Sequence, residues 1–233
     1  MRSAVDARGC TLLLSIFSFG AFGGPRQYAG VPNPEGKGIT VEIPYTFGTH
    51  EVAAKAVEGE VELDPESVDV RGGHLWVSIS ELKSDDPKRD CHMREALGLD
   101  YSRSRFPKEH ACDGQNRLPT SGNDAIVYPR IELRVTGSKA LDDPHLLAQG
   151  KEVRVLVTGD WTIHGVTRPA RLQLVASSDP KNPDALRVRG RQSFVLGDFG
   201  IEVKAANIVL TSVVVRGGAT ATFDLRLEPA PKP

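Results

Sequence analysis

The chain has 233 residues, which is enough for one large β domain or two small ones. Its 29 basic and 30 acidic residues nearly cancel, and aromatic residues make up only 6% of the chain. This balance argues against the basic surface of a nucleic-acid-binding protein, and the few aromatic residues argue against a platform for stacked bases. The 16 Pro and 23 Gly residues favour many short turns over long helices.

The N-terminal segment, residues 1–24, is typical of a secretory signal peptide. Arg2 and Arg8 give it a positive start, and an apolar run follows from Cys10 to Phe22. That run is too short to cross a membrane comfortably. We therefore expect export and cleavage, giving a periplasmic or secreted protein, with an uncleaved anchor as the alternative. Residues 25–37 are rich in Pro and Gly and predict a linker.

The rest of the chain is dominated by segments in which apolar and polar residues alternate. This period of two is the pattern of half-buried antiparallel strands. The alternating segments are 40–47, 60–64, 74–82, 130–136, 153–163, 170–176, 186–196 and 219–227. They predict one all-β domain of about eight strands over residues 38–228, arranged as a sandwich or a barrel. A disordered tail is expected at 229–233.

One segment breaks the alternation and predicts a short helix. Ser84-Asp85-Asp86-Pro87 places N-cap candidates directly before a Pro, which is favoured in the first turn. Lys88–Leu97 then carries Met93 and Leu97 on an apolar face. A loop without periodicity follows at 108–124.

The central hairpin, Lys151–Ala176, carries a family resemblance. Its sequence GDWTIHGVTRPA at 159–170 closely resembles the central hairpin of the YceI-like family. The segments RDCHMRE at 89–95, with Phe106-Pro107 after it, and FVLGDFGI at 194–201 agree with that family. The resemblance spans residues 38–228 in the expected order, but the loop at 108–124 looks longer than in the family.

The resemblance implies both a fold and a ligand. YceI-like proteins are periplasmic, lipocalin-like proteins that bind polyisoprenoids and similar lipids, so it implies an antiparallel β-barrel with a short flanking helix and an apolar interior. The protein would then sequester an isoprenoid or other long-chain lipid without acting on it. The residues expected to contact this ligand are Ile43, Tyr45, Leu75, Val77, Ile79, Met93, Leu97, Ile131, Leu133, Val155, Val157, Leu172, Leu174, Phe194 and Phe199.

Two other functions stay open at this point. Periodicity alone does not distinguish a hollow barrel from one filled by side chains. An enzyme acting on a lipid or an amide in the cavity, or an envelope interaction module with a filled core, would show the same alternation. A homodimer and peripheral contact with a membrane are further options.

Cys91 and Cys112 are the only cysteines that remain once a signal peptide is removed. A pair of cysteines in an exported protein predicts a disulfide. The alternative is zinc, since His92 and His110 lie beside the two cysteines. We favour the disulfide, because adjacent Cys and His ligands are geometrically awkward, and we expect no metal.

The remaining polar residues favour structural roles. His164 lies in the hairpin turn without a nearby nucleophile or carboxylate, so we expect it to bond the backbone. The pairs Asp85-Asp86 and Asp142-Asp143 precede Pro, as caps and turn residues do. No catalytic or cofactor-binding motif occurs, and we predict a protein that is not an enzyme and needs no cofactor. The outward residues Arg187, Arg189 and Arg191 form a basic stripe, which suits a solvated face better than an anionic head group or membrane.

Overall fold

The computed structural model describes residues 24–34, 36–45, 48–106, 108–109, 112, 119–202, 206–208, 211–213 and 217–231, without the side chains of 206–213. All of the expected signal peptide except Gly24, and residues 110–111 and 113–118 of the loop expected at 108–124, lie outside these residues. The strands are β1 (Arg26–Val31), β2 (Gly38–Tyr45), β3 (Gly48–Ala54), β4 (Glu58–Asp64), β5 (Asp69–Ser78), β6 (Arg130–Ala140), β7 (Val153–Ile163), β8 (Val166–Asp179), β9 (Asn182–Val195), β10 (Ala206–Ile208), β11 (Thr211–Val213) and β12 (Gly218–Pro229). The helices are α1 (Pro87–Gly98) and the short 3-10 helices η1 (Pro144–Gln149) and η2 (Leu196–Phe199).

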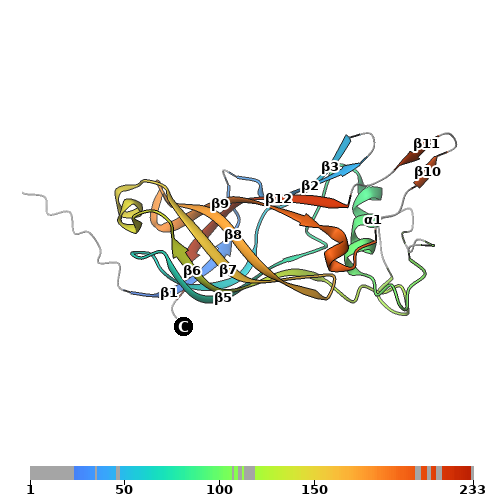
Figure 1. The fold of residues 1–233 in the computed structure, drawn as a ribbon, viewed down its shortest axis with the longest axis horizontal. Helices are drawn as coiled ribbons and strands as arrows, with labels where there is room; N and C mark the ends of the chain where they lie inside the picture. The colour runs from blue at the N-terminus through green and yellow to red at the C-terminus, as the bar shows by residue number, and fades with distance from the viewer. Residues whose placement is uncertain are drawn as a thin grey trace, which may run out of the picture.

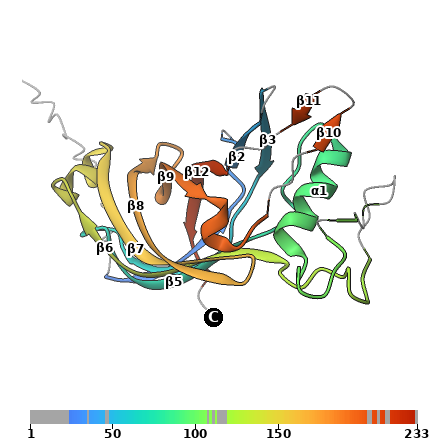
Figure 2. The ribbon, with the colours of Figure 1, turned by 45° about the vertical axis from the view of Figure 1, so that its right-hand side comes forward.

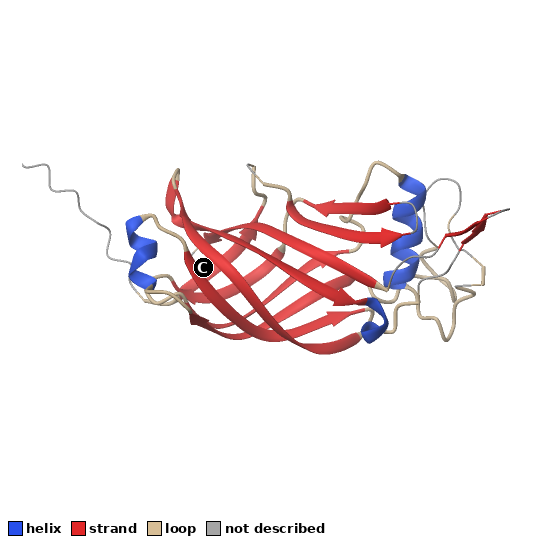
Figure 3. Ribbon diagram, turned by 45° about the horizontal axis from the view of Figure 1, so that its top comes forward, coloured by secondary structure: helices blue, strands red, loops and turns tan. Residues whose placement is uncertain are grey.

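Eight antiparallel strands close into a barrel in the order β1-β4-β5-β6-β7-β8-β9-β12, and β12 pairs back to β1. Figure 3 shows these strands running obliquely around an elongated body. One edge of β12 pairs with β9, and its other edge pairs with β2 through Thr220–Asp224 and with β1 beyond it. The β2–β3 hairpin therefore extends the wall at one end of the barrel. The predicted all-β barrel with one short flanking helix is confirmed.

The linker expected at 25–37 is wrong for Arg26–Val31, which forms β1 and closes the barrel between β4 and β12. Tyr28 in this strand is completely buried. Gly30 is needed for close packing, because a Cβ there would lie 2.2 Å from the carbonyl oxygen of Val57. The composition of this segment indicated turns. Its strand conformation depends on pairing with β4 and β12, which are distant in the sequence, so the local pattern could not predict it.

The prediction of a disordered tail at 229–233 is also wrong for its first two residues, Pro229 and Ala230. Pro229 is the last residue of β12, and the backbone N–H of Ala230 donates to the carbonyl oxygen of Gln27 at 2.8 Å. The end of β12 is therefore held against β1.

The central hairpin is formed by β7 and β8, which pair in continuous register from Val153↔Ala176 to Ile163↔Val166. Its two turn residues, His164 and Gly165, have φ values of 51° and 72°, as a tight hairpin with a primed turn requires. The ring of His164 lies 2.8 Å from the carbonyl oxygen of Leu99 and 3.3 Å from that of Phe199. The prediction that His164 bonds the backbone is confirmed. These contacts hold the hairpin turn against η2 and against Leu99, which follows α1.

The two ends of the barrel differ. Figure 1 shows η1 at one end and α1, with the tip of the β2–β3 hairpin, at the other, and Figure 2 shows α1 standing beside that hairpin. The predicted cap of α1 is confirmed, since the carboxylate of Asp86 accepts from the N–H groups of Lys88 and Arg89, each at 3.1 Å. At the other end Asp143 caps η1 through the N–H of His145.

Asp142 provides a pH-dependent contact at the η1 end. Hydrogen bonds from the side chain and backbone of Arg154 lower the pKa of Asp142 to about 2. Because the unfolded value is about 3.9, the pair stabilises the fold above about pH 4, and this contribution is lost as the pH falls toward 2. Replacing Asp142 with Asn should lower the melting temperature slightly at pH 7, since the pair is exposed. Thermal melts between pH 7 and 2 should show this difference vanishing; a difference independent of pH would contradict the assignment.

Ion pairs on the outer face join β9 to other segments of the chain. The basic stripe predicted on β9 exists, but each arginine has an acidic partner: Arg187 pairs with Asp224, Arg189 with Glu152, and Arg191 with Glu42. The stripe is therefore part of a mixed-charge surface, as expected for a solvated face. Among the described residues, no helix combines the length and apolar character needed to span a membrane.

Candidate functional site

The barrel is hollow. Its interior holds a cavity of about 960 Å³, at the upper end of the range of about 300–1,000 Å³ that is usual for ligand sites. Side chains on the inner face of every barrel strand except β1, together with β2, β3, α1 and η2, contribute to the wall. Because successive residues of a strand point to opposite faces, the alternation in the sequence becomes a nearly continuous apolar lining.

All the residues expected to contact a ligand line this cavity, with one exception. The lining residues are Ile43, Tyr45, Leu75, Val77, Met93, Leu97, Ile131, Leu133, Val155, Val157, Leu172, Leu174, Phe194 and Phe199. Ile79 is the exception, because β5 ends at Ser78 and the chain leaves the barrel wall there. Its side chain packs instead toward α1, where a Cβ at Gly98 would lie 2.7 Å from the Cδ1 atom of Ile79.

An aromatic cluster forms part of the lining beside these aliphatic residues. The ring of Trp161 lies edge-on to Phe194 with centroids 5.4 Å apart, and it stacks on Phe223 at 6.3 Å. Phe194 in turn meets Phe199 of η2 at 6.1 Å. The alternation placed Trp161 and Phe223 on the inner face, but it did not indicate that three strands and η2 bring these rings together.

The polar part of the lining comes from the β2–β3 hairpin, the first turns of α1 and the segment after η2. Its residues are Tyr45, His50, Asp86, Lys88, Arg89, His92 and Glu202. The Arg89 guanidinium lies 3.0 Å from a carboxylate oxygen of Asp86 and 5.3 Å from the centre of the Tyr45 ring. These residues form a polar mouth at the α1 end, and except for Tyr45 the sequence did not single them out for ligand contact, because alternation identifies only the walls.

The mouth is close to electrically neutral. Burial, and then the charge of Arg89, lower the pKa of His50, so this imidazole is neutral at pH 7. A hydrogen bond from the backbone N–H of Arg89 lowers the pKa of Asp86, which keeps that carboxylate charged. Asp86 and Glu202 then balance Lys88 and Arg89. In the described part of the chain, the Nε2 atom of His50 is buried and has no hydrogen-bond partner.

A disulfide joins α1 to the loop that follows it. Cys91 and Cys112 are bonded, with Cα atoms 5.9 Å apart, so the predicted pairing is confirmed. Cys91 is buried on α1, whose residues Met93 and Leu97 line the cavity. The bridge therefore holds the helix that borders the mouth.

Removing this bridge should destabilise the protein measurably. Replacing both Cys91 and Cys112 with Ser opens a loop of 21 residues, and we expect a loss of about 2 to 3 kcal/mol in the free energy of unfolding. Urea unfolding of the double variant and of the wild type measures this loss. Non-reducing peptide mapping of the wild type should show Cys91 linked to Cys112. An unchanged midpoint would show that the bridge does not restrain the unfolded chain.

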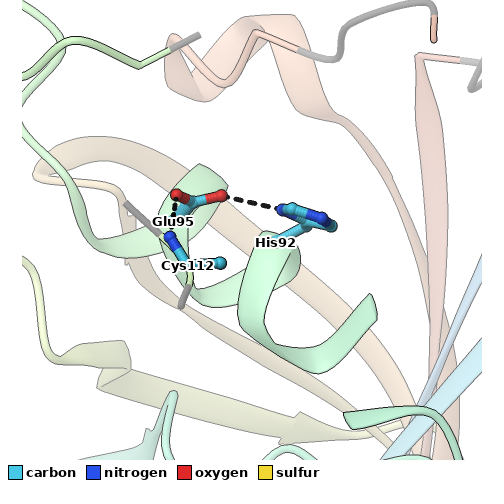
Figure 4. A group of neighbouring side chains, drawn as sticks. All are labelled: His92, Glu95 and Cys112. Carbon is cyan, nitrogen blue, oxygen red and sulfur yellow. Dashed lines mark hydrogen bonds and ion pairs between the residues drawn. The ribbon is translucent and has the colours of Figure 1, made fainter. Parts of the chain in front are cut away.

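Beside the disulfide lies a cluster formed by His92, Glu95 and Cys112, which Figure 4 shows. Glu95 is fully buried, which is rare for a carboxylate. One of its oxygens lies 2.9 Å from Nδ1 of His92, and the other accepts the backbone N–H of Cys112 at 3.0 Å. Sequence reasoning missed Glu95, because a glutamate on a surface helix is expected to face water.

Comparison with known proteins identifies the fold. No protein-family model and no curated protein matches the sequence. A polyisoprenoid-binding domain from Saccharophagus degradans, implicated in plant cell wall breakdown, superposes with a TM-score of 0.53 at 13% identity, covering 87% of this chain and 98% of that one. BcnA from Burkholderia cenocepacia superposes with a TM-score of 0.51 at 14% identity, covering 81% and 95%. The chain has the fold of these two proteins.

The antiparallel barrel that the hairpin motif implied is thus confirmed as a fold. A YCEI protein from Campylobacter jejuni is also similar, with a TM-score of 0.47 at 13% identity, covering 76% of this chain and 82% of that one.

Proposed function

We propose that this protein binds one lipophilic chain, a polyisoprenoid or a similar amphiphile, inside the barrel and does not alter it chemically. The observation that carries this proposal is the large cavity inside a closed barrel, lined almost wholly by aliphatic and aromatic side chains. The polyisoprenoid-binding domain from Saccharophagus degradans, which shares the fold, supports the choice of ligand class.

Burial of apolar surface would provide the affinity. Each Å² removed from water contributes about 25 cal/mol, and a micromolar complex needs about 8 kcal/mol. About 330 Å² of buried apolar surface is therefore required beyond the area that offsets the ordering of a flexible chain. A long isoprenoid or acyl chain, enclosed on all sides by the barrel wall, can meet this requirement.

The two ends of the barrel indicate the direction in which the chain lies. At the η1 end, Tyr28 and Leu147 belong to the packed core but do not border the cavity. At the α1 end, the lining becomes polar around Tyr45, His50 and Arg89. We infer that the apolar tail points toward η1 and that the polar head lies at the α1 mouth.

An extracytoplasmic location is part of the proposal. The Cys91–Cys112 bridge is consistent with an oxidising compartment, and residues 1–24 would act as the cleaved export signal. N-terminal sequencing of the protein from the envelope fraction should give a mature chain beginning within residues 21–28. Recovery of intact Met1, or of the protein in the cytosol, would contradict export.

The binding proposal is tested by mass spectrometry of organic extracts from the natively purified protein. A long-chain lipid should be present at about one molecule per chain and should exchange with an added isoprenoid alcohol. A protein that carries no lipid and takes up none of the added alcohol would overturn the proposal.

A further inference from the structure

The cluster around Glu95 brings together more potential metal ligands than a disulfide-bonded helix needs. The ligand atoms of His92, Glu95 and Cys112 all lie within 4.8 Å of one another. Cys91, whose sulfur is bonded to that of Cys112, adds a second sulfur. Two sulfurs, one imidazole nitrogen and one carboxylate oxygen are a donor set that suits Zn²⁺ and not Mg²⁺ or Ca²⁺.

The local geometry explains why these atoms converge. Cys91 and Glu95 are one helical turn apart on α1, and His92 is three residues before Glu95, so Cys91 and His92 each lie about one turn from Glu95 on the helix surface. Cys112 reaches the same place from the following loop, where its N–H is held by Glu95. A tetrahedral zinc ion keeps its ligand atoms about 3.3–3.8 Å apart, given bond lengths of about 2.0–2.3 Å. Small side-chain rotations would bring His92, Glu95 and Cys112 to these distances. Cys91 is adjacent to His92 on the helix, so it reaches the ion only once the S–S bond is broken and its side chain turns toward Glu95.

We propose that reduction of the Cys91–Cys112 bridge by a dithiol converts this cluster into a zinc site. The dithiol gives two electrons to the S–S bond and becomes a disulfide itself, while the two cysteine sulfurs take up two protons. Zinc then binds Sγ of Cys91, Sγ of Cys112, Nδ1 of His92 and one carboxylate oxygen of Glu95, and the two thiol protons pass to solvent. In the oxidised protein the sulfurs are bonded to each other and are not thiolate ligands.

The buried carboxylate supports this assignment. A buried anion is costly unless cations or hydrogen-bond donors compensate it. The contacts of Glu95 include His92 and the N–H of Cys112, and both of these residues carry a further ligand atom. A divalent cation among the four groups would compensate the carboxylate and the two thiolates together. The site does not depend on lipid binding, although it shares α1 with the cavity wall.

The test compares zinc binding by the oxidised and the reduced protein. The full chain, with Cys10→Ser so that only two thiols respond, is reduced with a phosphine, which leaves no competing thiol, and dialysed against zinc. The reduced protein should bind one zinc ion per chain, and the oxidised protein should bind none at the same concentration. Replacing zinc with Co²⁺ should give the absorption of a tetrahedral site with thiolate ligands.

Two variants separate this site from adventitious binding. Glu95→Gln keeps the size of the side chain but loses its charge, and it should weaken zinc binding by the reduced protein at least tenfold. His145→Gln removes an exposed histidine at the opposite end of the barrel and should change nothing. Equal binding by both redox forms, or unchanged affinity in Glu95→Gln, would overturn the proposal. A reduced chain that loses its β-sheet circular dichroism and does not regain it with zinc would also overturn it.

Discussion

Replacing Val157 with Trp is expected to reduce the lipid retained by the purified protein at least tenfold while leaving the barrel folded. Val157 lies on β7, and its side chain borders the cavity. An indole in this place would occupy space that the ligand needs. Because the interior is hollow, the larger ring meets open space instead of packed neighbours, so the overpacking cost of about 1–3 kcal/mol in a filled core should be largely avoided.

Leu156→Trp is the matched control for this prediction. Leu156 is the next residue on the same strand, but it faces outward and does not line the cavity. Its lipid content should equal that of the wild type. The measurements are the lipid-to-protein ratio and the melting temperature of each variant. A Val157→Trp protein that retains its lipid would show that the ligand does not occupy this part of the cavity. A destabilised variant of a protein that never carried lipid would favour a filled core and an interaction module.

Replacing Gly159 with Ala is expected to cost more than about 3 kcal/mol of stability, beyond the usual range for one added methyl group. Gly159 lies where β7 passes the bulge of β6, between Val135 and Gly137. A Cβ at Gly159 would lie 2.0 Å from the backbone carbonyl oxygen of Arg134. A backbone atom cannot rotate away as a side chain can, so β6 and β7 would have to separate.

Gly137→Ala provides the matched control within the same bulge. There, a Cβ would find its nearest neighbour, Oγ1 of Thr158, at 3.7 Å, which is an ordinary contact. Urea unfolding of both variants should show a large loss for Gly159→Ala and a change within about 1 kcal/mol for Gly137→Ala. Equal losses would contradict the close approach of the two strands.

Much of the barrel wall could be predicted because, in a half-buried strand, each residue is apolar or polar according to whether it faces the interior or the solvent. Val153, Val155 and Val157 alternate with polar residues or the outward Leu156, and the structure places them on the inner face of β7. The helix start at Asp86 was predictable because capping follows a local rule, and the disulfide was predictable because only two cysteines remain after the expected signal peptide.

The features that were missed depend on contacts between distant parts of the chain. Arg26–Val31 becomes a strand because β4 and β12 both offer it an edge, and β12 lies some 200 residues later in the chain. Ile79 continues the alternation of β5, yet the strand has already ended. The hollow interior, the polar mouth around His50 and the burial of Glu95 depend on how elements meet in space, and periodicity in one segment does not contain that information.

The most direct test of the central claim uses Trp161, which lines the cavity. The chain has two tryptophans, so Trp76→Phe leaves Trp161 as the only fluorescent indole. Trp161 lies near the His164 turn, which contacts the segment after α1, so the label belongs near the polar end of the lipid. A long-chain lipid with a nitroxide on its chain close to the head group should quench Trp161 in a saturable manner, with one lipid per chain at the end point, and an unlabelled isoprenoid alcohol should reverse the quenching. Lipid that binds without quenching Trp161, or no saturable binding, would contradict a ligand chain inside the barrel.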